Sequence, residues 1–262
     1  MPGYIKMPAR VIAITNQKGG VGKTTTAISL SGAVAIQGKK VLLCDLDPQA
    51  NATLGLGFQK GEIHYSISEI LLDGLSVSSA VRRTIIDNLL ILPSNADSIG
   101  IEIDLIEKAN RESLLKTALN LALSDFDYIF LDCPPSLGLL TVNALVSANS
   151  VLIPMQCEFL AMEGLVQLLN TIEFIRARLN PSLEIEGIVL TMFDARTNLS
   201  KEIETEIREY FRERIRVFKT VIPRNIRLSE APSHGLPISL YAKNTPGAWS
   251  YEALGEELTG IG

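Results

Sequence analysis

The sequence NQKGGVGKTT occupies residues 16–25, between a short apolar run at residues 11–15 and a stretch with helical spacing of apolar residues at 24–37. Its glycines allow the backbone to curl closely around an anion, because they carry no Cβ atom to obstruct it. Successive N–H groups and the positive end of the following helix then point at the same spot. The segment therefore predicts a phosphate-binding loop between the first strand and the first helix.

The loop departs from the standard pattern G-x-x-x-x-G-K-[ST] at its first position, where Gln17 replaces glycine. It matches a deviant form that begins with Lys18, which is a second lysine in addition to Lys23. Lys23 is expected to bridge the β- and γ-phosphates of a nucleotide, Thr24 to bind Mg²⁺ through its hydroxyl, and Thr25 to lie near the α-phosphate. The predicted nucleotide contacts in the loop are Lys18, Gly19, Gly20, Val21, Gly22, Lys23, Thr24 and Thr25.

Short β-branched and apolar runs alternate along the chain with longer stretches of helical spacing, which is typical of parallel strands joined by crossover helices. The predicted strands are residues 11–15, 41–45, 89–92, 128–132, 151–154, 185–192 and a short one near 219–222. The predicted helices are residues 24–37, 111–123, 137–148, 162–179 and 201–214. Most strands read as continuously apolar, as strands covered on both faces should. We predict an α/β fold: a doubly wound, mostly parallel sheet with helices on both faces.

The composition fits one such domain. No Pro/Gly/Ser-rich linker divides the 262 residues, so we predict a single domain over 1–262, with residues 1–10 as a short N-terminal extension. No apolar run reaches the roughly 18 to 20 residues that span a bilayer, and residues 1–10 lack the apolar centre of a secretory signal. We therefore expect a cytoplasmic protein. The net charge of −5 argues against a wholly basic nucleic-acid-binding surface but leaves local basic patches open.

Carboxylates stand where two of the predicted strands end. Asp45 and Asp47 mark the end of the strand at 41–45, and Asp132 ends the strand at 128–132. Ligands of open α/β sheets bind at the carboxyl edge, where these side chains gather. We expect Asp132 to hold Mg²⁺ through a water, Asp45 to organise the metal's shell, and Asp47 to position or deprotonate the attacking water. A purely capping role for one of Asp45 and Asp47 stays open.

Several segments together resemble the ParA/Soj chromosome-partitioning ATPases. They are the loop with its extra lysine, DLDPQ at 45–49, DCPP at 132–135, TMFDARTN at 191–198 and VIPRNIRLSEAPSHG at 221–235. The similarity runs from about residue 11 to about residue 241, in order and at the family's spacing. It is specific, because the last two segments are not general features of phosphate-binding loops.

The resemblance implies an ATPase that uses ATP and Mg²⁺ and forms a homodimer around the nucleotides. Lys18 would reach the partner's phosphates and clamp the developing charge. Gly19 would lie where the subunits cross, with no room for a side chain, and Pro223 and Asn225 would contact the adenine. The predicted catalytic residues are Lys18, Lys23 and Asp47. The family further implies chromosome or plasmid segregation, nonspecific DNA binding, nucleoid association of the ATP-bound form, and a ParB-type partner that stimulates hydrolysis.

Nonspecific DNA binding requires lysines and arginines directed at phosphates. Residues 208–227 contain only two acidic side chains, Glu209 and Glu213, against Arg208, Arg212, Arg214, Arg216, Lys219, Arg224 and Arg227. We predict DNA contacts at Arg196, Arg224 and Arg227, with Arg196 placed on the same face by the family resemblance. A charged run on an amphipathic helix is also typical of an ordinary solvated face, and that interpretation stays open for any single arginine.

Two other classes share this loop. Septum-positioning ATPases of the MinD class act at the membrane surface and need a C-terminal basic amphipathic helix, whereas residues 250–262 carry three acids, no base and helix-weakening glycines. We expect no membrane partner and keep this class as the alternative function. ATP-driven reductases and metal-cluster carriers need cluster thiolates, but Cys44, Cys133 and Cys157 lack metal-ligand spacing and are expected to be buried free thiols. His234 is expected to cap a loop.

Overall fold

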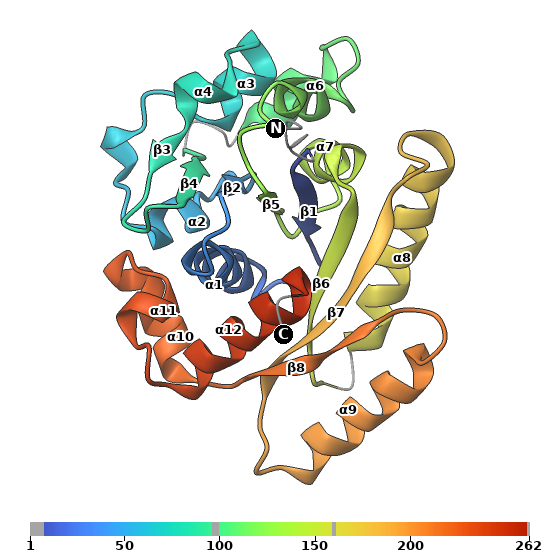
Figure 1. Cartoon of the computed structure of the whole chain (residues 1–262). Coiled ribbons are helices and arrows are strands. Elements are labelled where there is room, and N and C mark those ends of the chain that lie inside the picture. The colour runs from blue at the N-terminus through green and yellow to red at the C-terminus, as the bar shows by residue number, and fades with distance from the viewer. Residues whose placement is uncertain (1–7, 96–99, 159–160, 261–262) are drawn as a thin grey trace, which may run out of the picture.

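The computed structural model describes residues 8–95, 100–158 and 161–260, so that residues 1–7 of the predicted N-terminal extension lie outside it. The described strands form one sheet in the order β3-β4-β2-β5-β1-β6-β7-β8 (Figure 1). They are β1 (Arg10–Ile14), β2 (Val41–Asp45), β3 (Arg82–Arg83), β4 (Leu89–Leu92), β5 (Tyr128–Asp132), β6 (Ser150–Gln156), β7 (Glu184–Phe193) and β8 (Val217–Pro223). Every neighbouring pair is parallel except β3 and β4.

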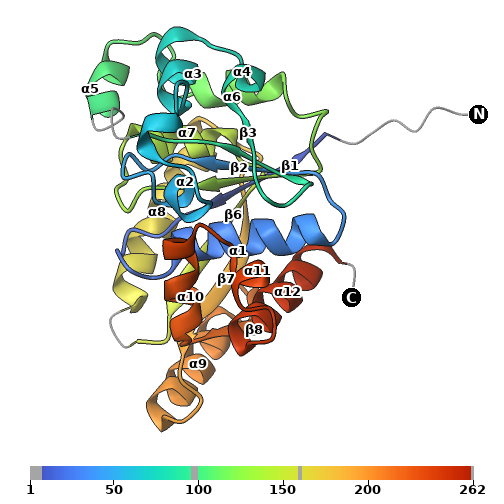
Figure 2. The same ribbon diagram turned by 90° about the vertical axis from the view of Figure 1, so that its left-hand side faces the viewer.

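Helices cover both faces of this sheet, as Figure 2 shows. One face carries α1 (Lys23–Ile36), α2 (Asn51–Gly55), α10 (Ile226–Glu230), α11 (Ile238–Tyr241) and α12 (Pro246–Thr259). The other carries α3 (Ile67–Asp73), α4 (Val77–Ala80), α5 (Ile101–Ile106), α6 (Leu114–Asn120), α7 (Leu139–Ser147), α8 (Ala161–Arg178) and α9 (Asn198–Phe211). The short 3₁₀ turns η1 (Lys60–Glu62) and η3 (Ala231–His234) lie in connections. The predicted doubly wound α/β fold is confirmed.

The two cores explain why the strands are apolar at every position. In β1, Val11 and Ala13 pack into the core on the α7 side, whereas Ile12 and Ile14 pack into the core on the α1 side. Successive side chains of a strand point to opposite faces, so a strand buried on both sides needs no polar alternation. Among the described helices, none is both long enough and apolar enough to cross a bilayer.

All predicted strands and helices occur, with ends that differ by at most three residues. The C-terminal segment forms a continuous helix, α12, of 14 residues despite the glycines within it. A Cβ atom at Gly255 would lie 3.5 Å from the Cβ of Ala33 and 3.0 Å from Nε2 of Gln37. Glycine at this position therefore allows α12 to approach α1 closely.

Charged side chains bind the backbone of β8 where this last strand has a bulge. Ile188 pairs with Val217 and Leu190 with Val221. The register therefore advances by four residues in β8 and by only two in β7, which makes a bulge in β8. The Glu257 carboxylate on α12 accepts hydrogen bonds from the backbone N–H groups of Lys219 and Thr220 at 2.9 and 3.0 Å. The guanidinium of Arg208 on α9 donates to the carbonyl oxygens of residues 218 and 219 at 3.0 and 3.3 Å. Glu257 and Arg208 thus replace bonds that the bulge removes from the ladder.

Replacing Glu257 by alanine is expected to lower the free energy of unfolding by about 1–3 kcal/mol, because two backbone donors lose their acceptor. Burial by itself raises the pKa of Glu257, but the hydrogen bonds from Lys219 and Thr220 outweigh it and hold that pKa below 4.5. A carboxylate with a depressed folded pKa contributes stability above its unfolded pKa, and this contribution is lost as the pH falls through the folded value.

Urea denaturation at neutral pH and at a pH well below 4.5 measures this effect. The difference between the wild type and Glu257→Ala should shrink in acid. The matched control is Glu256→Ala, which removes an exposed neighbouring carboxylate on the same helix and should change stability by only a few tenths of a kcal/mol. Equal losses in the two variants, or a difference that persists in acid, would contradict the role of Glu257.

Candidate active site

The glycine-rich loop joins β1 to α1 at the carboxyl edge of the sheet. Gly20 and Gly22 have φ angles of 73° and 88°, in the left-handed region that a side chain strains. A Cβ atom at Gly19 would meet no atom within 4 Å. Within the single chain a side chain would therefore fit at Gly19. The crowding that we predicted there would have to come from a second molecule.

Side chains from the neighbouring strand ends bind the outward-turned carbonyl groups of the loop. Nε2 of Gln156, the last residue of β6, donates to the carbonyl of Gly20 at 2.9 Å. The Thr191 hydroxyl, from β7, donates to the carbonyl of Val21 at 2.9 Å. Asn16 links the start of the loop to β6, since its Nδ2 donates to the carbonyl of residue 154 at 2.8 Å. Sequence reasoning missed both residues, although Gln156 is a polar residue that ends an apolar strand, which is the same signal that marks Asp132.

Asp45 and Asp132 stand side by side, because they are paired across the last positions of β2 and β5. Both oxygens of the Asp132 carboxyl are buried and accept no hydrogen bond within normal geometry from the described residues. Burial raises the pKa of Asp132 well above 3.8 and the Asp45 charge raises it further, whereas the nearby Thr24 hydroxyl and Lys23 favour the ionised form. A buried carboxyl without partners fits a hydrated divalent cation, which would satisfy both oxygens.

Asp45 and Asp47 have different surroundings. The Asp45 carboxylate accepts from the backbone N–H and the hydroxyl of Thr53, both at 2.8 Å, and from the N–H of Asp47 at 3.2 Å. Burial raises the pKa of Asp45 to about 6, although these bonds act in the opposite direction. Asp45 therefore accepts backbone N–H groups as a capping residue does, and its part in a metal shell stays a prediction. The Asp47 carboxylate accepts one hydrogen bond from the described residues, from the backbone N–H of Gln49 at 2.9 Å.

The two lysines of the loop point to different places. Nζ of Lys23 donates to the carbonyl of Lys18 at 3.2 Å, and burial lowers the pKa of Lys23 against the opposing effect of Asp132 and Asp47. Nζ of Lys18 lies near the surface and forms an ion pair with Glu158, at 3.0 Å from Oε2. Lys18 thus has a partner within its own chain, which sequence reasoning missed.

Two cavities meet at the loop. The first, which we call the loop cavity, has a volume of about 370 Å³, and its walls include Gly19, Gly20, Gly22, Lys23, Thr24, Thr25 and Asp47. The second, the lateral cavity, has a volume of about 240 Å³, and its walls include Thr191, Ile222, Pro223, Arg224, Asn225, Leu228 and Tyr251. Gly22, Thr25 and Met192 line both cavities. The structure thus brings Pro223 and Asn225, predicted from the resemblance alone, next to the loop.

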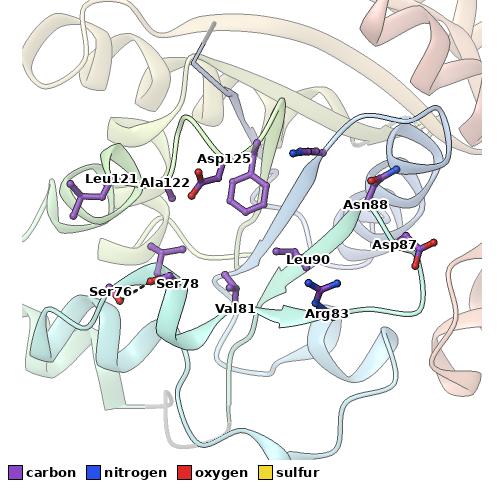
Figure 3. A pocket seen from close by; sticks show the side chains of 13 residues that line it. Ser76, Ser78, Val81, Arg83, Asp87, Asn88, Leu90, Leu121, Ala122 and Asp125 are labelled. Atoms are coloured by element: carbon purple, nitrogen blue, oxygen red, sulfur yellow. Dashed lines mark hydrogen bonds between the residues drawn. The ribbon is translucent and has the colours of Figure 1, made fainter. Parts of the chain in front are cut away.

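A larger cavity of about 450 Å³ lies elsewhere, beside the amino-terminal ends of β2 and β4 (Figure 3). Arg83 and Asp87 stand at one end of it and Leu121 at the other (Figure 3). None of the described residues that line it is a glycine. Its charged side chains have both signs, so it lacks the features of a phosphate site.

The arginines predicted to bind DNA are exposed, and two of them, Arg196 and Arg227, are paired with carboxylates. The Arg196 side chain is 86% exposed and makes two hydrogen bonds to the carboxylate of Asp194, at 2.7 and 2.8 Å. Arg224 lies nearby, because its N–H donates to the carbonyl of Phe193, and Arg227 pairs with Glu230 at 2.7 Å. The wider basic cluster is partly dispersed, since Arg208 and Arg216 are bound to glutamates and backbone carbonyls.

The three cysteines and His234 lie in surroundings that indicate packing and not chemistry. Cys44, Cys133 and Cys157 are buried free thiols, and burial raises the pKa of Cys133, which disfavours the thiolate that a metal cluster needs. Within residues 8–95, 100–158 and 161–260, no three His, Cys, Asp or Glu side chains are grouped so that they could hold a metal ion. His234 stacks on Tyr241, with ring centroids 4.8 Å apart.

Known proteins resemble this chain over nearly its whole length. Residues 9–185 match a family model described as an AAA domain. The sporulation initiation inhibitor protein Soj of Bacillus subtilis is 51% identical over 97% of this chain and 99% of its own. The chromosome partitioning protein ParA of Myxococcus xanthus is 49% identical over 95% of this chain and 87% of its own. A solved structure of cobyrinic acid a,c-diamide synthase from Mycobacterium smegmatis, with bound ADP and magnesium, has a TM-score of 0.82 at 38% identity and covers 95% of this chain and 93% of its own.

Proposed function

The chain belongs to the ParA/Soj family of chromosome-partitioning ATPases, and from that premise we propose that it is an ATP-driven switch that pairs with a second copy of itself and then binds DNA without sequence preference. The observation that carries the proposal is the site at the loop, where a buried, unpartnered Asp132 carboxyl and a buried Lys23 stand beside two cavities that share lining residues. This combination suits a nucleotide with a bound cation better than it suits a simple anion.

We assign the phosphates to the loop cavity and the base to the lateral cavity. The loop cavity offers glycine backbone, Lys23 and Thr24, which are the groups that bind phosphates in such loops. The lateral cavity has the apolar side chains of Ile222, Pro223 and Leu228 among its walls, which suit a flat base. Thr25 and Met192 line both cavities and would stand beside the sugar.

Thr24 and Asp132 would hold Mg²⁺, with Asp45 in the outer shell. A Mg²⁺ ion held there would supply positive charge close to the β- and γ-phosphates. Lys23 would bind the oxygens between these phosphates. Asp47 is the only one of the three carboxylates among the residues that line the loop cavity, so we assign it to the attacking water, whose proton it would accept or whose position it would fix.

Lys18 provides the switch in this proposal. Its ammonium group lies at the surface, and within the described residues it is paired with Glu158, in an exposed ion pair that contributes about 0–1 kcal/mol. Exchanging Glu158 for the phosphates of a partner subunit would thus cost little and would supply a charge where the transition state needs one. The open surroundings of Gly19 would allow a second chain to approach the loop.

Two subunits held together by ATP would present two sets of arginines to DNA at once. Nonspecific affinity rises steeply with the number of phosphate contacts, so that a dimer binds where a monomer does not. Hydrolysis would then release the DNA, and we propose a ParB-type partner as the stimulus. The ATP-bound form would accordingly associate with the nucleoid.

Replacing Arg196 by alanine is expected to weaken binding of the ATP-bound dimer to random duplex DNA severalfold and to lower the salt slope by about one per subunit. Among the described arginines that form ion pairs, Arg196 has the most exposed side chain, and phosphate oxygens can replace Asp194 as its partner. Fluorescence anisotropy across a salt series measures both quantities.

The matched control for Arg196 is Arg83→Ala, which removes an exposed arginine on the edge strand β3. It should leave DNA affinity unchanged. Sedimentation with a nonhydrolysable ATP analogue should find an intact dimer for Arg196→Ala. If dimer and DNA binding were lost together, Arg196 would belong to the subunit interface instead.

The membrane-surface alternative has no support in the described residues. The apolar residues Tyr251, Leu254 and Leu258 of α12 are buried in the core against α1, so that face of the helix is not available to a bilayer. Pelleting of anionic vesicles in the presence of an ATP analogue is the corresponding control in the DNA experiment.

A further inference from the structure

We propose that Gln156 is a positioning residue of the nucleotide site, which holds the phosphate-binding loop and the wall shared by the two cavities in one arrangement. Gln156 ends β6 and is only 9% exposed. Its Nε2 donates to the carbonyl of Gly20 at 2.9 Å and lies 2.8 Å from Sδ of Met192. A single side-chain amide therefore contacts both structures that would surround the nucleotide. The inference rests on the nucleotide site proposed above.

The contact with Gly20 fixes the direction of a loop N–H group. In a planar trans peptide the carbonyl of Gly20 and the N–H of Val21 point in opposite directions. The carbonyl turned toward Gln156 therefore directs the N–H of Val21 away from β6. Glycine peptides change orientation easily because no Cβ atom restricts them. An anchor outside the loop is what keeps such a peptide in one orientation before any phosphate arrives.

The contact with Met192 concerns the second cavity. Met192 has a φ of 51°, a left-handed conformation that a non-glycine residue adopts only when its surroundings enforce it. Its side chain lines the loop cavity and the lateral cavity alike. Gln156 reaches this side chain from the neighbouring strand, so that it ties the position of the shared wall to that of the loop.

Gln156 differs in this respect from Thr191, which also binds a loop carbonyl. Thr191 donates to Val21 and lines the lateral cavity, whereas Gln156 contacts both Gly20 and Met192. Gln156 lines neither cavity, so it would not touch the nucleotide. Its effect on binding must pass through Gly20 and Met192, which makes it a positioning residue and not a catalytic one.

The test is to replace Gln156 by methionine, which has a similar shape but cannot donate a hydrogen bond. Affinities for Mg-ADP and Mg-pyrophosphate are measured by calorimetry, together with the Tm of the nucleotide-free protein. We expect both affinities to fall about 5- to 50-fold, because the loop carbonyl loses its buried donor. Pyrophosphate reports on the loop alone, and the additional affinity of ADP reports on the lateral cavity.

The matched control is Asn180→Leu, which removes another buried amide that donates to two backbone carbonyls, those of Leu145 and Ala148 at 2.9 and 2.8 Å. It should lower the Tm and leave both affinities unchanged. Gln156→Glu keeps the size and polarity of the side chain, and its ionised carboxylate should weaken binding at least as much as methionine does.

If the affinities of the Gln156 variants equalled those of the Asn180 control, Gln156 would be merely structural and the proposal would fail. A loss for ADP without any loss for pyrophosphate would refute the role in the loop. A wild-type protein that binds neither ligand would refute the nucleotide site itself, which distinguishes failure of the proposed function from failure of this inference.

Discussion

Replacing Asp47 by alanine is expected to slow ATP hydrolysis by about 10²- to 10⁴-fold while ATP still binds, because the group that positions or deprotonates the water is lost. Asp47 lines the loop cavity, whereas Asp45 is fully buried and bound to Thr53. The variant should therefore accumulate as an ATP-bound dimer on DNA. Steady-state hydrolysis and retention on immobilised random duplex DNA measure the two effects.

A second substitution distinguishes the chemistry of Asp47 from its structural bond. Asp47→Asn keeps an oxygen that can accept the N–H of Gln49, a bond of 2.9 Å in the wild type, but has almost no basicity. Both variants should hydrolyse ATP slowly. Normal hydrolysis in Asp47→Asn together with slow hydrolysis in Asp47→Ala would assign Asp47 to the turn alone and remove it from the reaction.

Lys18→Ala is expected to abolish the ATP-dependent dimer and to leave nucleotide binding by the monomer nearly unchanged. Within the described residues, the Lys18 ammonium is held by the surface pair with Glu158, and the bond from Lys23 goes to the backbone carbonyl of Lys18, which alanine retains. Sedimentation velocity with a nonhydrolysable ATP analogue measures the dimer, and a fluorescent ADP analogue measures binding by the monomer.

Glu158→Ala is the matched control, since it breaks the same ion pair from the other side. It frees Lys18 for a partner subunit, so the variant should dimerise at least as well as the wild type. A Lys18→Ala protein that still forms the ATP-dependent dimer would exclude a cross-subunit role for Lys18. Loss of the dimer in Glu158→Ala as well would show that the ion pair within one chain, and not the reach across the interface, supports dimerisation.

The regular part of the fold could be predicted because its signals are local. The strand at Val41–Asp45 and the helix at Lys23–Ile36 have continuous or periodic apolar patterns long enough to recognise. The short helices α3, α4 and α5 gave no such signal, since each has at most two turns and depends on packing against its neighbours: α3 against α6, α5 against α7, and α4 against α3. The strand β3 has only two residues, which no periodicity reveals.

The sequence predicts which types of residue form the site, but it does not predict the contacts between them. Glycines, lysines and strand-end aspartates are recognisable one by one, and the structure brings them to the same edge of the sheet. The bonds from Gln156 to Gly20 and from Lys18 to Glu158 join residues 136 and 140 positions apart. Such pairs follow from the order of β1, β6 and β7 in the sheet, which the pattern along the chain does not specify.

The proposed switch is the control of this protein's affinity for DNA by ATP. It is tested most directly by the binding of wild-type protein to random-sequence duplex DNA, followed by fluorescence anisotropy across a salt series with Mg²⁺ and either a nonhydrolysable ATP analogue or ADP. We predict tight binding with the ATP analogue, with an affinity that falls steeply as salt rises, and at least tenfold weaker binding with ADP. Equal affinities in the two nucleotide states, or no DNA binding in either, would contradict the proposed switch.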